Sequence, residues 1–209
     1  MNTLSLKEYL TFFERKSTIK IEGNKKMDYQ KRKYINEITS NIIKIFGSIS
    51  VFPVEVEKIV KELNGKIKYD SDQTGLDAKI ERTNKDYSFI ITLYKTEPNN
   101  RKRFSIAHEL GHLFLHMGYL INEKKWEQTK DYSDLVFYRK GNQKQFEEYE
   151  ANEFAASLLM PENDFLKKIQ ELKDSDGYCN LNDLAEYFGV SSEAAKIRGK
   201  VLKVFPSYW

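Results

Sequence analysis

The sequence has little of the chemistry that marks secreted or membrane proteins. It contains one cysteine, four prolines and ten glycines in 209 residues. A single cysteine, Cys179, can form neither an internal disulfide nor a cysteine-type zinc site, so a cytoplasmic protein is expected. No uncharged apolar run approaches the roughly 18 residues that span a bilayer, and residues 1–16 lack the pattern of a secretion signal. No membrane partner is therefore expected.

The charge excess is also small. The chain has 34 basic and 31 acidic residues, whereas a strongly basic nucleic-acid binder has a larger and more clustered excess. Hydrophobic residues make up 40% and aromatic residues 13%, which is enough for a core and excludes overall disorder. Residues 1–47 hold ten basic and five acidic residues. We interpret this arm as a solvated or packing helical segment rather than a nucleic-acid contact.

Periodicity predicts an α+β protein in which a small sheet precedes most of the helices. We expect three segments: a helical N-terminal arm of unknown role over 1–47, a core over 48–161, and a helical C-terminal segment over 162–209 that packs on the core. The expected strands cover 66–69, 78–82 and 87–94. The expected helices cover two stretches before 47, then 54–63, about 101–117 and 145–160, with three short helices over 162–203.

All three histidines lie within residues 108–116, and the first two belong to an H-E-x-x-H motif. Residues four apart share a helix face, so His108 and His112 can bind one metal ion. Glu109 points about 100° away around the helix. That position suits a general base that takes a proton from a water held at the open coordination position.

A catalytic zinc site needs a third protein ligand. His116 lies two turns from His108, about 12 Å along the helix, so packing or a hydrogen bond to a ligand is its expected role. Cys179 belongs to an unrelated polar loop. A carboxylate from the helix predicted over 145–160 is therefore the expected ligand.

That helix offers four carboxylates. We favour Glu148, because Asn152 follows one turn later and its amide can orient a neighbouring ligand. Glu150 is the alternative ligand, and Glu147 and Glu153 are interpreted as solvated charges. Separately, the strand over 87–94 is either an edge to which a substrate peptide adds or an ordinary core strand.

Three pieces of the sequence resemble the ImmA/IrrE family of zinc metallopeptidases: residues 52–60, 104–116 and 148–161. The resemblance implies a zincin-like fold, Zn²⁺ held by His108, His112 and Glu148, and Glu109 as general base. It also implies a protein substrate, since members of this family act in bacteria and mobile elements on helix-turn-helix repressors. The expected protein is a zinc-dependent intracellular endopeptidase that acts on such a repressor or a similar regulator of a bacterial mobile element.

Two other functions stay open. Residues 181–196 resemble a helix-turn-helix, which would suit a regulator that binds a repressor or DNA without proteolysis. Residues 181–209 hold only four basic and three acidic residues, so DNA binding is unlikely. A scaffold with a non-catalytic metal is disfavoured because it has no need of Glu109. The sequence does not predict the oligomeric state, the cleavage site, any activating signal or the residue that stabilises the oxyanion.

Overall fold

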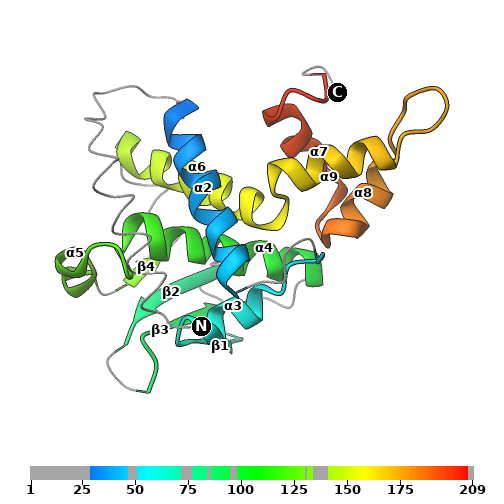
Figure 1. Ribbon diagram of the computed structural model, residues 1–209. Coiled ribbons are helices and arrows are strands. Elements are labelled where there is room, and N and C mark those ends of the chain that lie inside the picture. The colour runs from blue at the N-terminus through cyan, green and yellow to red at the C-terminus, as the bar shows by residue number, and fades with distance from the viewer. Residues whose placement is uncertain are drawn as a thin grey trace.

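A small mixed sheet lies at one end of the molecule, and helices stack on it in successive layers (Figure 1). The structure is a computed structural model that describes residues 29–46, 51–71, 77–83, 86–94, 98–129, 131–133 and 141–206. The sheet has the order β1-β3-β2-β4, with β1 and β3 parallel and the other pairs antiparallel. Its strands are β1 (Gly65–Tyr69), β2 (Ala78–Arg82), β3 (Phe89–Leu93) and β4 (Asp131–Ser133).

The helices form the larger part of the described chain, which confirms the α+β prediction. Helix α4 packs on β2 and β3, α6 packs on α4, and α2 packs on α6. The remaining helices flank these layers (Figure 1). The bounds of all the described helices are α2 (Tyr29–Phe46), α3 (Val56–Glu62), α4 (Asn99–Gly111), η1 (His112–His116), α5 (Glu123–Gln128), α6 (Gly141–Leu159), α7 (Glu162–Glu171), α8 (Leu181–Phe188) and α9 (Ser192–Val201).

Strand β3 lies in the interior of the sheet, between β1 and β2. Of the two alternatives for this strand, the edge open to a substrate peptide is therefore wrong, and the ordinary core strand is confirmed. Phe89, Ile91 and Leu93 are buried, as expected of an apolar strand covered on its faces. The edges are β1 and β4, and β4 falls in a polar stretch where the sequence predicted no strand.

Helix α2 is part of the core. Its buried side chains, Ile35, Ile38, Ile42 and Phe46, recur every three or four residues and face the protein interior. The second helical stretch predicted in the N-terminal arm is thus a packing helix. The first stretch lies outside the described residues.

The helix predicted over about 101–117 changes from an α-helix to a π-helix in its last turn. Residues up to Gly111 are α-helical, and η1 continues as a π-helix, in which the amide of Met117 donates to the carbonyl of His112 at 2.8 Å. Gly118, with φ +80°, ends the helix in the left-handed region. Such π segments are rare and occur mostly at functional sites.

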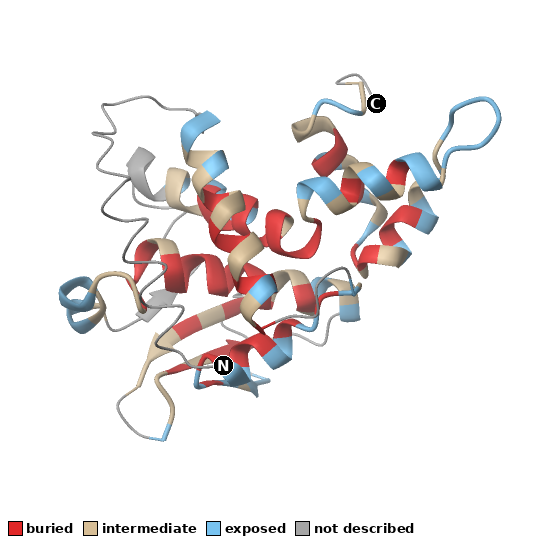
Figure 2. Cartoon of the chain, viewed as in Figure 1, coloured by how far each residue is buried: buried red, intermediate tan, exposed pale blue. Residues whose placement is uncertain are grey.

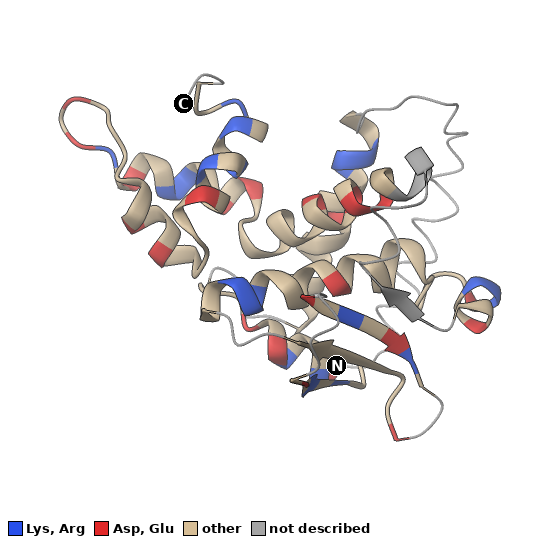
Figure 3. Ribbon diagram, turned by 180° about the vertical axis from the view of Figure 1, so that it is seen from behind, with Lys and Arg blue, Asp and Glu red and all other residues tan. Residues whose placement is uncertain are grey.

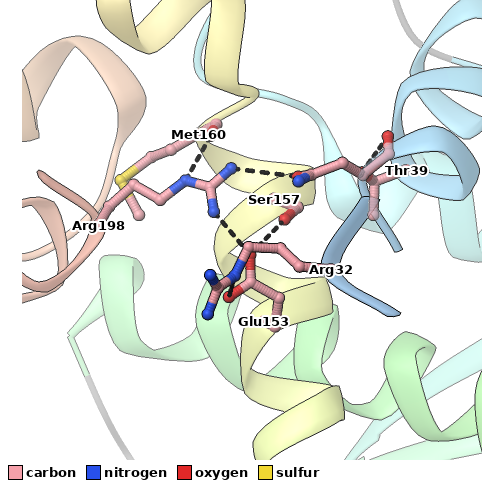
Figure 4. Close-up of polar contacts among 7 residues, drawn as sticks. Arg32, Thr39, Glu153, Ser157, Met160 and Arg198 are labelled. Atoms are coloured by element: carbon pink, nitrogen blue, oxygen red, sulfur yellow. Dashed lines mark hydrogen bonds and ion pairs between the residues drawn. The ribbon is translucent and has the colours of Figure 1, made fainter. Parts of the chain in front are cut away.

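Buried charges hold α9 against α6 and α2 (Figure 4). Arg198 is 1% exposed and donates to a carboxylate oxygen of Glu153 at 2.9 Å, to the carbonyl of Met160 at 3.1 Å and to the side-chain oxygen of Asn36 at 3.3 Å. Arg32 of α2 contacts the other oxygen of Glu153 at 3.3 Å. The interpretation of Glu153 as a solvated charge is therefore wrong: its carboxylate is the centre of a buried ionic cluster.

The C-terminal helices share the core of the rest of the molecule. Phe165, Leu184 and Phe188 belong to the same buried cluster as the sheet and α4 (Figure 2). Helices α8 and α9 are joined by a short turn in which Gly189, with φ +63°, ends α8 and the Ser191 side chain caps α9. Among the described residues, no helix is long and apolar enough to cross a membrane.

Candidate metal centre

The centre forms where α4 crosses α6, and a glycine permits the close approach of the two helices. A β-carbon placed on Gly111 would lie 3.0 Å from the Cα of Ala151 and 3.1 Å from the Cβ of Phe154. Any side chain at position 111 would push the helices apart. The H-E-L-G-H sequence thus supplies two histidines and also the contact that brings α6 within their reach.

Three candidate ligands meet at this crossing, one from each of His108, His112 and Glu148, and their ligand atoms all lie within 4.8 Å of one another. The Nε2 atoms of the two histidines are 2.9 Å apart, and the Glu148 oxygens lie 3.2 Å from His108 Nε2 and 3.3 Å from His112 Nε2. With metal–ligand bonds of about 2.0–2.2 Å, the ligand atoms of a tetrahedral zinc site are about 3.3–3.6 Å apart, slightly more than the separations found here. The spacing and the His₂Glu donor set therefore fit a catalytic zinc ion.

Hydrogen bonds on the far side of each ring leave the two Nε2 atoms available as ligands. His108 Nδ1 lies 3.0 Å from the side-chain oxygen of Asn152, and His112 Nδ1 lies 2.9 Å from His116 Nδ1. An amide oxygen only accepts, so His108 carries its proton on Nδ1 and a lone pair on Nε2. This is the tautomer that a metal requires when Nε2 is the ligand.

A series of polar contacts connects His112 to Lys31 of α2 through His116 and Glu150. His116 Nε2 lies 3.0 Å from a Glu150 oxygen, and the other Glu150 oxygen lies 3.0 Å from Lys31 Nζ. If His112 Nε2 holds a metal, His112 Nδ1 donates to His116 Nδ1, and His116 Nε2 then donates to Glu150. Glu150 therefore contacts His116, whereas Glu148 faces the two ligand histidines. This geometry favours Glu148 over Glu150 as the third ligand.

Burial and hydrogen bonding set the protonation states. Burial lowers the pKa of His112 from 6.5 to about 3, so the ring is neutral at pH 7. Burial alone would raise the pKa of Glu148, but hydrogen bonds with His108 and His112 outweigh it and lower the value to about 2. A neutral imidazole and an ionised carboxylate are the forms that bind metal. Burial opposes ionisation of Glu150 too, and its contacts with His116 and Lys31 lower its pKa nonetheless.

Glu109, the predicted general base, follows the first ligand on α4. The residue is 0% exposed, and both carboxylate oxygens are buried. The carboxylate is thus held away from bulk water, next in sequence to His108. Its role as general base stays a prediction.

The mixed α+β fold and a His-His-Glu group that could hold a metal ion are both compatible with a metallopeptidase-like protein. The family is shown by the sequence comparison. The chain belongs to the Peptidase M78 family, described as IrrE N-terminal-like domain, whose model matches residues 69–200. The match covers both the H-E-x-x-H helix and the helix that carries Glu148, and it confirms the resemblance to the ImmA/IrrE family.

Other comparisons add little. No curated protein matches the chain. Among solved structures, a Mycobacterium tuberculosis transcriptional regulator matches with 14% identity and a TM-score of 0.48, covering 91% of this chain and 50% of that one. The chain thus spans about half the length of that regulator.

Sequence reasoning missed two contacts of Glu150, one with Lys31 of α2 and one with His116. Lys31 lies in the segment whose role was unknown, and the pairing of Glu150 with His116 joins residues 34 positions apart. The sequence contains one indication that Glu150 lies near the centre, because Glu150 is two residues after Glu148, the favoured ligand. Nothing in the sequence marked Lys31.

Proposed function

We propose that the protein is a zinc-dependent endopeptidase. The convergence of two imidazole nitrogens and one carboxylate, from His108, His112 and Glu148, carries this proposal. The arrangement leaves a fourth position for a water or a substrate, as catalytic zinc sites do. Membership of a peptidase family supports the same activity.

In this proposal, three residues bind the ion and Glu109 transfers a proton. His108, His112 and Glu148 would hold the ion, and Asn152 fixes the orientation of the His108 ring. A zinc ion bound there would lower the pKa of water toward about 7 and polarise a substrate carbonyl. Glu109 would accept the proton of the attacking water and deliver it to the leaving amine.

The proposed substrate is a helix-turn-helix repressor or a similar regulatory protein of a bacterial mobile element. The support is the resemblance of residues 104–116 and 148–161 to family members that act on such repressors. This assignment is independent of the metal chemistry and needs its own test.

The alternative, a regulator that binds DNA through its C-terminal helices, has less support. In Figure 3, both basic and acidic positions are coloured along the ribbons of the C-terminal helices, so these helices do not carry charge of one sign. Arg198, one of the cations of α9, is buried against Glu153 and is not available to a phosphate. No described contact favours this function.

The proposal is tested first by metal content and then by cleavage. We expect about one zinc per chain in the wild type and in Glu109→Gln, and loss of zinc in Glu148→Ala. Purified repressors encoded beside the gene are then incubated with the wild type and with Glu109→Gln. Cleavage by the wild type alone is expected. A chain that takes up no zinc after reloading, or a Glu109→Gln variant that cleaves at the wild-type rate, would refute the mechanism.

A further inference from the structure

A cavity of about 1020 Å³ adjoins the metal centre. Its walls come from α2, the start of α4, α6, and the turn and helix that end at Val201. Two lining residues connect it to the centre: Asn152 contacts the His108 ring, and Phe104 lies one turn before His108 on the same face of α4. The cavity therefore reaches the neighbourhood of the candidate ligands, although none of the three lines it.

The wall that α9 contributes is apolar. Ala194, Ile197 and Val201 line the cavity and lie three and four residues apart, on one face of the helix. Ala156 and Met160 of α6 also line it. Ile197 is 52% exposed, so a ligand can reach this wall. Binding pockets are lined mostly by hydrophobic side chains.

Most charged groups in the lining already have a partner. Arg32 and Arg198 both contact Glu153, and Arg101 pairs with Asp77 at 3.0 Å. The remaining charged residue, Glu193, is exposed at the start of α9. Each of these three arginines thus already contacts a carboxylate, which weakens its attraction for a phosphate or another anion. Uncharged, apolar chemistry suits it best.

The size and position of the cavity point to a peptide. Pockets for small molecules span about 300–1,000 Å³, and this one, at about 1020 Å³, is slightly larger than that range. It adjoins a centre proposed to cleave a peptide bond, where a substrate segment must lie on each side of the scissile bond. An extended segment can place one side chain between α6 and α9 while its backbone passes the histidines.

We propose that this cavity binds the substrate segment beside the scissile bond and selects a bulky aliphatic or aromatic side chain, which packs against the Ala194, Ile197 and Val201 face of α9. The inference rests on the proposed peptidase function and adds the class of substrate side chain. It also gives the C-terminal helical segment a role in substrate recognition.

The test measures peptide binding without catalysis. Zinc-loaded full-length Glu109→Gln protein is immobilised and equilibrated with a library of short random-sequence peptides, and the bound peptides are sequenced. Enrichment of Leu, Ile, Met or Phe at one position is expected. Adding Ile197→Lys should reduce that enrichment about tenfold or more, the loss expected when one large apolar side chain is no longer buried.

Val204→Lys is the matched control, since Val204 is 41% exposed and does not line the cavity. It should leave the enrichment unchanged. Ile197→Ser serves as a second variant, and zinc content and thermal unfolding verify that each variant is folded. Absence of apolar enrichment, or equal enrichment with and without Ile197→Lys, would overturn the inference.

The outcomes also separate the inference from the proposed function. Apolar enrichment that Ile197→Lys removes, without any cleavage by the zinc-loaded wild type, would keep the recognition site and reject the peptidase. Cleavage that depends on Glu109 but shows no preference for apolar side chains would keep the peptidase and reject the recognition site.

Discussion

Replacement of Glu150 by leucine should weaken zinc binding although Glu150 is not a ligand. When His112 Nε2 binds the metal, its proton is on Nδ1 and points to His116, whose own proton then points to Glu150. Without Glu150, the His116 proton loses its charged acceptor. His116 can then carry its proton on Nδ1, so that its N–H group points at the Nδ1–H group of metal-bound His112. In the metal-free protein His112 can carry its proton on Nε2 instead, so only the metal-bound form is destabilised.

The size of the effect follows from the contacts. A hydrogen bond to a charged group contributes about 1.5–3 kcal/mol, and loss of such a partner behind a metal ligand costs about 10–100-fold in metal affinity. Glu150→Leu should fall in that range, because the carboxylate is 4% exposed and water replaces it poorly. Glu150→Gln keeps an acceptor oxygen but loses the charge, so a smaller loss of roughly threefold to tenfold is expected.

Competition with a chelating dye of known zinc affinity measures the change. Glu171→Leu is the control, since Glu171 is also a carboxylate paired with a lysine, Lys168 at 3.2 Å, but it is exposed and far along the chain on α7. Its zinc affinity should equal that of the wild type. A folded Glu150→Leu protein with wild-type affinity would refute the tautomer argument. Complete loss of zinc in Glu150→Leu, with zinc retained in Glu148→Ala, would instead make Glu150 the ligand.

Three further predictions concern stability. Gly111→Ala adds a β-carbon 3.0 Å from the Cα of Ala151, so urea unfolding should show a loss of about 1–2 kcal/mol, together with weaker zinc binding; an unchanged protein would mean that α4 and α6 can separate freely. Arg198→Met leaves the carboxylate of Glu153 with Arg32 at 3.3 Å, and it should cost about 3 kcal/mol, against under about 0.5 kcal/mol for Lys167→Met, whose exposed side chain pairs with Glu171; similar values for the two would show that the buried cluster contributes little. Removal of zinc by a chelator should lower the melting temperature by roughly 5–10 °C, since free zinc at 100 times its dissociation constant stabilises by about 2.7 kcal/mol; an unchanged melting temperature would argue against a bound ion.

The parts of the structure that could be predicted from the sequence are those with local signals. The H-E-x-x-H spacing predicts a helix with two histidines on one face, and β2 has the bounds expected from its residues. The strand at 131–133 could not be predicted, because it is three residues long and its pairing with β2 joins residues about 50 positions apart. The π-helical turn at His112 also lacks a local signal.

Charged residues were the hardest to interpret from the sequence. Glu147, Glu148, Glu150 and Glu153 lie within seven positions on one helix, and sequence alone cannot tell which partners each will meet. In the structure, Glu148 faces the ligand histidines, Glu150 contacts His116, and Glu153 lies in the ionic cluster with Arg198. The partners come from α2, α4, η1 and α9, so their identity depends on tertiary packing rather than on helix periodicity.

Helix α6 carries both a candidate metal ligand and residues of the cavity, yet the sequence motif predicts the metal chemistry and not the substrate. One side of the helix presents Glu148 to the histidines, and the next turn presents Asn152 both to His108 and to the cavity. The ligand and the cavity lining thus belong to one rigid element, so a substrate side chain bound against α9 would be positioned relative to the metal by the packing of α9 on α6. That packing depends on Arg198 and Glu153, which lie 45 residues apart in the chain. If the cavity selects the substrate, Arg198→Met should therefore alter peptide preference in addition to stability, whereas zinc content should be unaffected.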